Sequence, residues 1–313
     1  MRLRAGRPDL RRYAERFDVP SAGAGGPSIT FLGVSTLLID DGRSAVMTDG
    51  FFSRPGLARV LAGRLAPDVT RIERCLTRAG VRRLEAITAV HTHYDHALDT
   101  ATVAELTGAV MIGGVSAASL ARGHALPERQ IRVGQPDEPM TYGAYRLTLI
   151  PGRHCPPDRY PGEIVEPLRP PARVRAYRCG QAWGVHLRHS PSGRTVLVVG
   201  SAGWVDGALT GHHADVVYLG VGQLGLQPAR YLRRYWDHTV RQVGARRVVL
   251  IHWDDFFRPL DRPPRALPFL GDDLDHTMGV LTGLAERDAV SLHLPKVWHR
   301  EDPWCGLPAD GPD

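Results

Sequence analysis

The stretch that decides the fold is HTHYDH, residues 91–96, which directly follows the apolar run EAITAV. His91 and His93 are two residues apart at the end of a predicted strand, so their side chains point the same way. Asp95 and His96 follow in the turn that leads into a predicted helix. Neutral imidazole and carboxylate groups are the ligands that Zn²⁺ and similar cations prefer. Three imidazoles and one carboxylate within six residues therefore predict a metal centre.

Apolar runs rich in Val, Ile and Leu recur along the chain, and each ends on a polar residue or a glycine. The runs are 85–91, 145–154, 195–201, 215–222 and 246–252, after three strands predicted at 28–32, 35–40 and 44–49. Helical patterns are predicted at 69–79, 97–106, 116–122, 229–243 and 273–286. Such runs are typical of strands covered on both faces, in an α/β layered fold. Three of the five runs end in histidine, so these histidines are predicted to share one sheet edge.

The composition is that of a folded globular chain, with 43% hydrophobic and 23% charged residues. We predict an N-terminal arm at 1–27, one domain at 28–300 and a C-terminal tail at 301–313. Four scattered cysteines without a CxxC pair argue against a disulfide scaffold and a thiolate zinc site. No apolar run approaches the roughly 20 residues that span a bilayer, and no secretory signal is visible. We expect a cytoplasmic protein.

The sequence resembles the metallo-β-lactamase superfamily, whose HxHxDH motif is matched in full by HTHYDH. A later histidine of the family, for the first metal, is matched by His154 in LIPGRHCPP, and the last one, for the second metal, by His252 in VVLIHWDD. Asp49 in VMTDGFF matches an aspartate that supports the site. The resemblance covers roughly residues 28–295 and implies a four-layer αβ/βα sandwich. The opening GVSTLLID…TDGFFSRP resembles the branch with L-ascorbate-6-phosphate lactonase and N-acyl-phosphatidylethanolamine phospholipase D.

The resemblance also implies ligands and a reaction. The implied ligands of the first metal are His91, His93 and His154, and those of the second are Asp95, His96 and His252. The implied cofactor is Zn²⁺, one ion or two, although imidazole also accommodates Mn²⁺ or Fe²⁺. The implied reaction is hydrolysis of a small ester, lactone, amide or phosphodiester by a metal-bound hydroxide. Asp95 is the best candidate to orient the attacking water.

One residue departs from the family pattern. The family supplies a bridging aspartate after an apolar strand, whereas this chain has Ser201 in VLVVGSAGW. Without that carboxylate, two dications share one less negative ligand, so the second site should bind metal more weakly or recruit another carboxylate. The candidates for such a substitute are Asp206, Asp254 and Asp255, each of which could instead be a surface or supporting residue.

The substrate contacts and two alternative functions stay open at this stage. Trp253 and the Pro-rich loop at 156–175 are candidate contacts for a small-molecule substrate, and the loop is equally well explained as a surface crossover. A nucleic-acid phosphodiesterase of the same superfamily would explain the positive charge, but the sequence has no added nucleic-acid domain and no aromatic platform beside a basic groove. A non-catalytic metal-binding or scaffold protein would follow if the missing aspartate abolished activity. The sequence assigns no oligomeric state.

The net charge gives a first test. The formal charge of +6 arises from arginines spread over the chain, without a dense basic block beyond the first twelve residues. We therefore expect weak binding to duplex and single-stranded oligonucleotides that vanishes near physiological salt, because scattered cations displace few counterions. Fluorescence anisotropy at low and physiological salt measures this. Sub-micromolar binding at physiological salt, with cleavage, would favour the nuclease instead.

Overall fold

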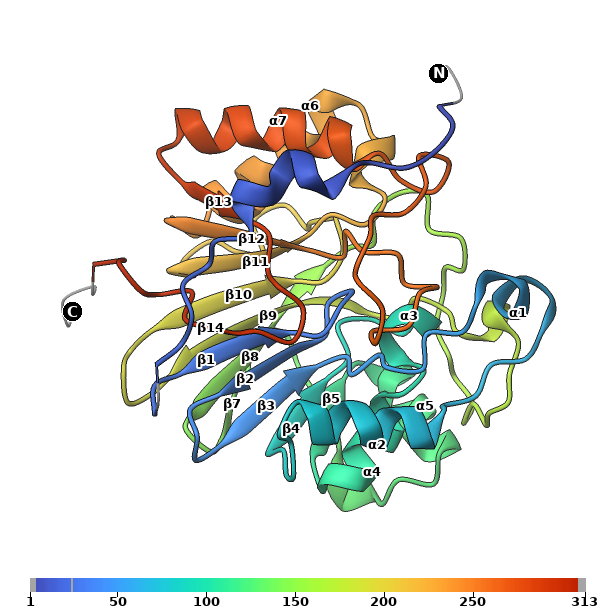
Figure 1. Cartoon of the computed structure of the whole chain (residues 1–313). Helices are drawn as coiled ribbons and strands as arrows, with labels where there is room; N and C mark the ends of the chain where they lie inside the picture. Colours follow the sequence, from blue (N-terminus) through green and yellow to red (C-terminus); the bar gives the residue numbers. More distant parts are fainter. Residues whose placement is uncertain (1–3, 24, 309–313) are drawn as a thin grey trace.

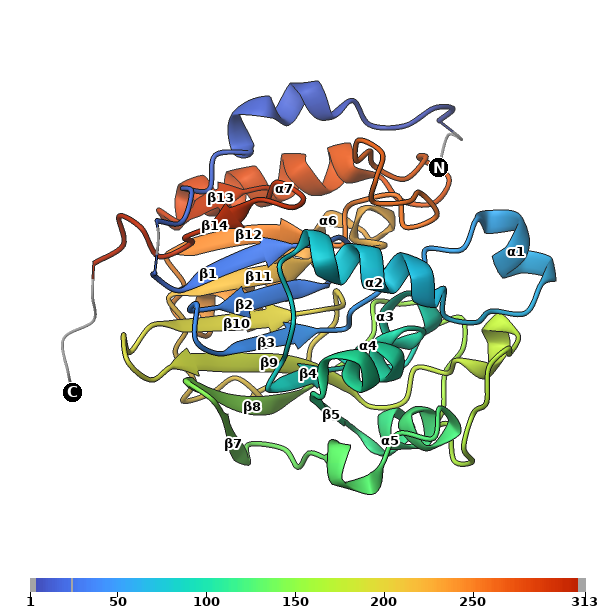
Figure 2. The same ribbon diagram turned by 60° about the horizontal axis from the view of Figure 1, so that its bottom comes forward.

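A computed structural model describes residues 4–23 and 25–308 of the chain. Two seven-stranded sheets lie face to face, and helices cover the outer face of each (Figures 1 and 2). The order of layers is thus helix, sheet, sheet, helix, because each sheet must bury both of its apolar faces. This arrangement confirms the predicted four-layer αβ/βα sandwich.

The first sheet has the strand order β14-β1-β2-β3-β4-β5-β6. Its strands are β1 (Ser28–Phe31), β2 (Leu37–Asp40), β3 (Ala45–Thr48), β4 (Ala86–Thr88), β5 (Val110–Gly113), β6 (Ile131–Val133) and β14 (Arg300–Glu301). Strands β1 to β3 are antiparallel, and β3 to β6 run parallel. Along β2 and β3 the side chains alternate: Leu38 and Met47 pack toward the helices, while Ile39 and Val46 pack toward the second sheet.

The second sheet has the strand order β13-β12-β11-β10-β9-β8-β7. Its strands are β7 (Pro139–Tyr142), β8 (Tyr145–Gly152), β9 (Ala182–His189), β10 (Thr195–Val199), β11 (Val216–Gly220), β12 (Arg247–Ile251) and β13 (Ser291–His293). Strands β10 to β13 are parallel, and β10, β11 and β12 are buried at all five positions. This burial on both faces explains why these strands read as continuous apolar runs.

Helices surround the two sheets. They are α1 (Leu57–Ala62), α2 (Val69–Arg78), α3 (Tyr94–Ala97), α4 (Thr100–Thr107), α5 (Val115–Gly123), α6 (Ala229–Trp236) and α7 (Leu274–Arg287), with a 3-10 helix at Leu10–Arg16 and a π turn at Asp237–Arg241. The outer face of the first sheet packs on α2, α4 and α5, and that of the second on α6 and α7 (Figure 2). Within the described ranges, no helix has the length and apolar character needed to cross a membrane.

Both ends of the described chain pack on the domain. Tyr13, in the predicted arm, donates a hydrogen bond from its hydroxyl to Asp275 on α7 at 2.7 Å. In the predicted tail, Glu301 pairs with Ile29 of β1, and the Trp304 indole donates to the Thr195 carbonyl at 3.0 Å. The domain boundaries at 28 and 300 stay predictions.

A buried ion pair joins two loops at the edge where β1 and β12 end. Arg54 Nη2 lies 2.7 Å from Asp254 Oδ2, and the two side chains are 2% and 3% exposed. The other carboxylate oxygen accepts a hydrogen bond from the Val34 N–H at 2.8 Å, and the Val34 carbonyl accepts from the His252 N–H at 2.7 Å. A Cβ on Gly33 would lie 1.8 Å from the guanidinium, so only glycine allows this approach. The ion pair therefore fixes the backbone at His252.

The Arg54→Met variant tests this ion pair. We expect the free energy of unfolding to fall by about 3–5 kcal/mol, because the Asp254 carboxylate is left buried without its counter-charge. Urea denaturation followed by circular dichroism measures the change. Arg59→Met, on the exposed side of α1, is the matched control and should change it by less than about 0.5 kcal/mol. Equal effects of the two substitutions would contradict the role given to the pair.

Candidate metal centre

Five histidines and one aspartate come together where β4, β8 and β12 end. The HTHYDH stretch at 91–96, here called the metal motif, begins three residues after β4, while His154 follows β8 and His252 directly follows β12. Two sets of three donors result, and within each set the ligand atoms lie within 4.8 Å of one another. The sets are His91, His93, His154 and Asp95, His96, His252. The chain thus brings together all six residues that the sequence singled out as ligands.

The first set consists of three imidazoles around a common point. The ring centroids of His91, His93 and His154 lie 4.6–5.1 Å apart, with interplanar angles of 77–83°. Both ring nitrogens of His91 are buried and have no hydrogen-bond partner. Burial and the neighbouring imidazoles hold the pKa of His91 well below its usual value, and burial lowers the pKa of His154 to about 4. These rings are neutral at physiological pH, which is the form that binds metal.

Hydrogen bonds fix the ring tautomers of two further ligand candidates. His154 Nδ1 lies 2.6 Å from the Cys155 carbonyl, and His96 Nδ1 lies 2.8 Å from Asp49 Oδ2. A carbonyl and an ionised carboxylate only accept hydrogen bonds, so each Nδ1 carries the hydrogen and Nε2 keeps the lone pair. Metal-binding histidines are usually held this way. Asp49, predicted to support the site, lies where such a partner is needed.

The second set has the dimensions of a cation site. His252 Nε2 lies 3.2 Å from His96 Nε2 and 3.5 Å from Asp95 Oδ2, and the last two atoms are 3.8 Å apart. Bond lengths of about 2.0–2.1 Å to a tetrahedral zinc ion place neighbouring donors about 3.3 Å apart. Burial opposes ionisation, but His96 and His252 outweigh it and lower the pKa of Asp95. Asp49 and Asp95 likewise outweigh burial and raise the pKa of His96.

His252 adopts a backbone conformation that is unusual for a residue other than glycine. Its φ of 62° lies in the left-handed region, which costs of order 1–3 kcal/mol and persists only where the surroundings enforce it. The hydrogen bond to Val34 described above holds this backbone. Gly222 gives the ring room, because a Cβ there would lie 2.7 Å from His252 Nδ1. The strain places Nε2 of His252 beside Asp95 and His96.

Ser201 and the three candidate substitute carboxylates lie in different surroundings. The Ser201 hydroxyl accepts a hydrogen bond from the Cys155 N–H at 3.0 Å, so it anchors the backbone next to His154. The Asp206 side chain is 72% exposed, Asp254 pairs with Arg54, and Asp255 pairs with Arg7 and Arg265. Among residues 4–23 and 25–308, none of these three aspartates belongs to a cluster of metal donors. A substitute bridging carboxylate is therefore not found at the positions that the sequence suggested.

Trp253 lies in the core. Its side chain is 2% exposed, and its ring packs on Phe17 at 5.7 Å and on Phe31 at 6.1 Å between centroids. The Trp253 ring thus packs into the core, whereas the His252 ring belongs to the second donor set. The predicted substrate contact of Trp253 has no support in this packing.

Two residues beside the metal motif escaped the sequence analysis. Asp158 Oδ1 lies 3.2 Å from His93 Nε2, and His93, Asp158 and Cys179 form a third group of donors within 4.8 Å. Asp158 belongs to the Pro-rich loop that the sequence placed near the site. Its carboxylate had no distinguishing signal, because it approaches His93 only through contacts between segments far apart in the sequence.

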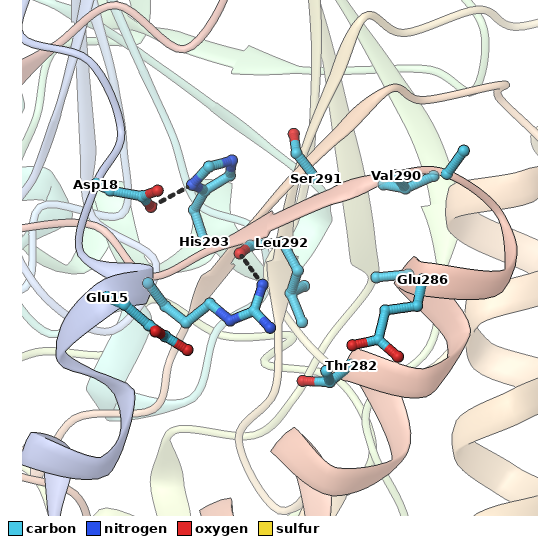
Figure 3. Close-up of a pocket in the computed structure, with 11 residues that line it drawn as sticks. Glu15, Asp18, Thr282, Glu286, Val290, Ser291, Leu292 and His293 are labelled. Atoms are coloured by element: carbon cyan, nitrogen blue, oxygen red, sulfur yellow. Dashed lines mark hydrogen bonds and ion pairs between the residues drawn. The ribbon is translucent and has the colours of Figure 1, made fainter.

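A pocket of about 540 Å³ opens elsewhere, between the N-terminal 3-10 helix, α7 and β13. Its polar lining includes Glu15, Arg16, Asp18, Thr282, Glu286 and His293. Figure 3 shows the Asp18 carboxylate pointing at His293, with Oδ1 2.6 Å from Nδ1. None of the six ligand candidates lines this pocket, so it is separate from the metal centre.

The fold of this chain is similar to that of solved structures. No protein-family model matches the sequence, and no curated protein matches it. Similar solved structures include the metallo-β-lactamase fold protein YhfI from Bacillus subtilis (14% identity, TM-score 0.51, 86% of this chain and 97% of that one) and an isothiocyanate hydrolase from Delia radicum gut bacteria (15%, 0.51, 86% and 96%). CmlA, a diiron β-hydroxylase from Streptomyces venezuelae, is also similar (12%, 0.53, 87% and 53%). The chain therefore has the metallo-β-lactamase fold.

Proposed function

We propose that this protein is a metal-dependent hydrolase of the metallo-β-lactamase superfamily. The observation that carries the proposal is the convergence of two three-donor sets at one sheet edge, one of them containing a histidine with both buried nitrogens unpartnered. Leaving such a polar atom buried and unpaired costs about 1–3 kcal/mol, and a bound cation removes that cost for the ring nitrogen that carries the lone pair. The proposed ligands are His91, His93 and His154 for the first ion and Asp95, His96 and His252 for the second. Zn²⁺ is the first choice for this nitrogen and oxygen donor set.

The residues around the cation have separate tasks in hydrolysis. A bound divalent cation supplies acidification of water and polarisation of the scissile carbonyl or phosphoryl oxygen. Asp95 stays ionised because its pKa is lowered, so its carboxylate can accept a hydrogen bond from the attacking water and orient it. Asp49 holds His96 through Nδ1, and the Cys155 carbonyl holds His154 in the same way. Held rings keep the donor atoms in place throughout a reaction cycle.

The substrate that we propose is a small ester, lactone, amide or phosphodiester. Similar folds carry different chemistries, as the isothiocyanate hydrolase and the diiron β-hydroxylase illustrate, so the fold does not select one of these bonds. We retain the likeness to the lactonase and phospholipase D branch as part of the proposal, because it rests on the sequence around residues 33–55. The four cysteines are unpaired, which supports the proposed cytoplasmic location.

The first experiment on this proposal counts metal. The purified full chain should contain a transition metal, and chelator should remove hydrolysis of whichever ester, lactone or phosphodiester in a panel is turned over. His93→Ala should lose most of the metal and the activity, because it removes a donor from the three-histidine set. His252→Ala should lose less metal, since it affects the set that lacks the bridging carboxylate. Mass spectrometry of the metal content measures both.

His299→Ala is the matched control. This histidine contacts Ser21 and belongs to neither donor set, so its substitution should leave metal content and activity unchanged. A wild-type chain that contains no metal and cannot take it up would end the proposal.

A second experiment concerns Ser201. Ser201→Asp should raise the metal content toward two equivalents, because it restores a negative charge next to His154. Ser201→Asn is the control, because asparagine has the size of the introduced aspartate but is neutral. Its amide oxygen can accept from the Cys155 N–H, and the metal content should stay unchanged. Equilibrium dialysis against zinc buffers measures the second dissociation constant. Two tightly bound equivalents in the wild-type chain, unchanged in Ser201→Asp, would show that the serine does not weaken the second site.

A further inference from the structure

The Pro-rich loop is held against the metal motif. We call residues 156–180 the docked loop. The Cys179 carbonyl accepts hydrogen bonds from the Thr92 N–H at 2.8 Å and from the Thr92 hydroxyl at 3.1 Å. Thr92 stands between His91 and His93, so the loop is fastened at the centre of the motif. Gly180, with φ of 62°, permits this approach, because a Cβ there would lie 2.9 Å from Thr92 Oγ1.

Pairing within the docked loop sets the position of Asp158. The Cys179 N–H donates to the Tyr160 carbonyl at 2.8 Å, and the Gly180 N–H donates to the Gly162 carbonyl at 2.9 Å. The Tyr160 N–H in turn donates to Asp158 Oδ1 at 3.0 Å. The carboxylate is therefore oriented by its own loop before it contacts the motif.

The oriented carboxylate meets the outer nitrogen of a proposed ligand. Asp158 Oδ1 lies 3.2 Å from His93 Nε2, with side chains that are 23% and 9% exposed, and the Tyr160 carbonyl lies 3.4 Å from the same nitrogen. The Tyr160 carbonyl only accepts hydrogen bonds, so Nε2 carries the hydrogen and the lone pair of His93 is on Nδ1, and the Asp158 carboxylate lies at ion-pair distance from the same N–H. That leaves Nδ1 as the nitrogen able to join the donor set of His91 and His154.

We propose that Asp158 is a positioning residue of the metal centre, which holds His93 as an Nδ1 ligand and places a negative charge beside a site that has serine at 201. This inference rests on the proposed function and deepens it. Asp49, directly after β3, anchors His96 through Nδ1 and leaves Nε2 as its donor atom, so each metal set would have one histidine anchored by a carboxylate. The charge raises the basicity of the imidazole and offsets part of the cation's charge.

The experiment uses cobalt as the probe and the full chain as the protein. The apo-forms of the wild type, Asp158→Asn, Asp158→Ala and Glu163→Gln are titrated with Co²⁺ against a competing chelator, and the visible spectrum of each saturated form is recorded. Glu163 is the matched control, because it lies in the docked loop but binds the Gln181 side chain at 2.6 Å. Circular dichroism and thermal melting establish that each variant is folded.

We expect Asp158→Ala to weaken cobalt binding about 10–100-fold, as substitution of such supporting carboxylates does. The cobalt affinity of Asp158→Asn should lie between those of Asp158→Ala and the wild type, since the amide keeps a polar oxygen beside Nε2 but carries no charge. Glu163→Gln should bind as the wild type does. The saturated spectra of all four proteins should agree, because Asp158 is not itself a ligand.

Two results would overturn the inference. One is equal affinity of Asp158→Ala and Glu163→Gln for cobalt. The other is a saturated spectrum that indicates a different cobalt coordination number in Asp158→Asn than in the wild type, or that contains a sulfur-to-cobalt charge-transfer band. Either spectrum would show that Asp158 or Cys179 is itself a ligand. A wild type that binds no cobalt at all would instead remove the proposed function on which the inference depends.

Discussion

The rest of the site depends on the cost of burying six donor side chains together. His91, His96 and the aspartate that supports it are at most 1% exposed, and burial on this scale removes the hydration of their polar atoms. Asp49 and the Cys155 carbonyl each satisfy one outer nitrogen, whereas neither ring nitrogen of His91 has a hydrogen-bond partner. A divalent cation is the group that satisfies several lone pairs at once. The strained backbone at His252 and the buried ion pair behind it are consistent with a fold that keeps these donors converged.

Much of this architecture could be predicted from the sequence. Runs of apolar residues mark the buried strands, and the polar residues that follow these runs mark the strand ends. The five apolar runs correspond to β4, β8, β10, β11 and β12, and the polar residues that follow them meet at one edge. Strands β5, β6 and β13 were missed, although β1 to β4 are equally short and were predicted, so strand length alone does not explain the difference. The long strand β9 was also missed, since Ala182–His189 alternates apolar residues with Gly, His and Arg in a segment next to the Pro-rich loop. The helix predicted at 97–106 corresponds to α4, which begins three residues later, at Thr100, because Asp99 before it accepts hydrogen bonds from the Phe52 and Ser53 N–H groups.

The limits of sequence reasoning at the site have a physical cause. Candidate ligands could be named because histidine spacing at strand ends is a local property, and their convergence follows from sheet topology. The supporting residues depend on contacts that no local pattern encodes. Asp254 looked like a spare carboxylate but is occupied by Arg54, 200 residues away in the chain. Asp158 looked like one polar residue among prolines and arginines. It reaches His93 only because Tyr160 and Gly162 pair with Cys179 and Gly180 within the docked loop.

The donors come from both sheets, and a bound ion would therefore connect the two sheets. The metal motif follows β4 of the first sheet, whereas His154 and His252 follow β8 and β12 of the second. Under the proposed ligation, each ion would act as a clamp between the two halves of the sandwich, linking segments that are 63 and 156 residues apart. An ion that binds only the folded form adds stability by mass action. The concentration of free metal in the surroundings would then shift the equilibrium between the folded and the unfolded chain.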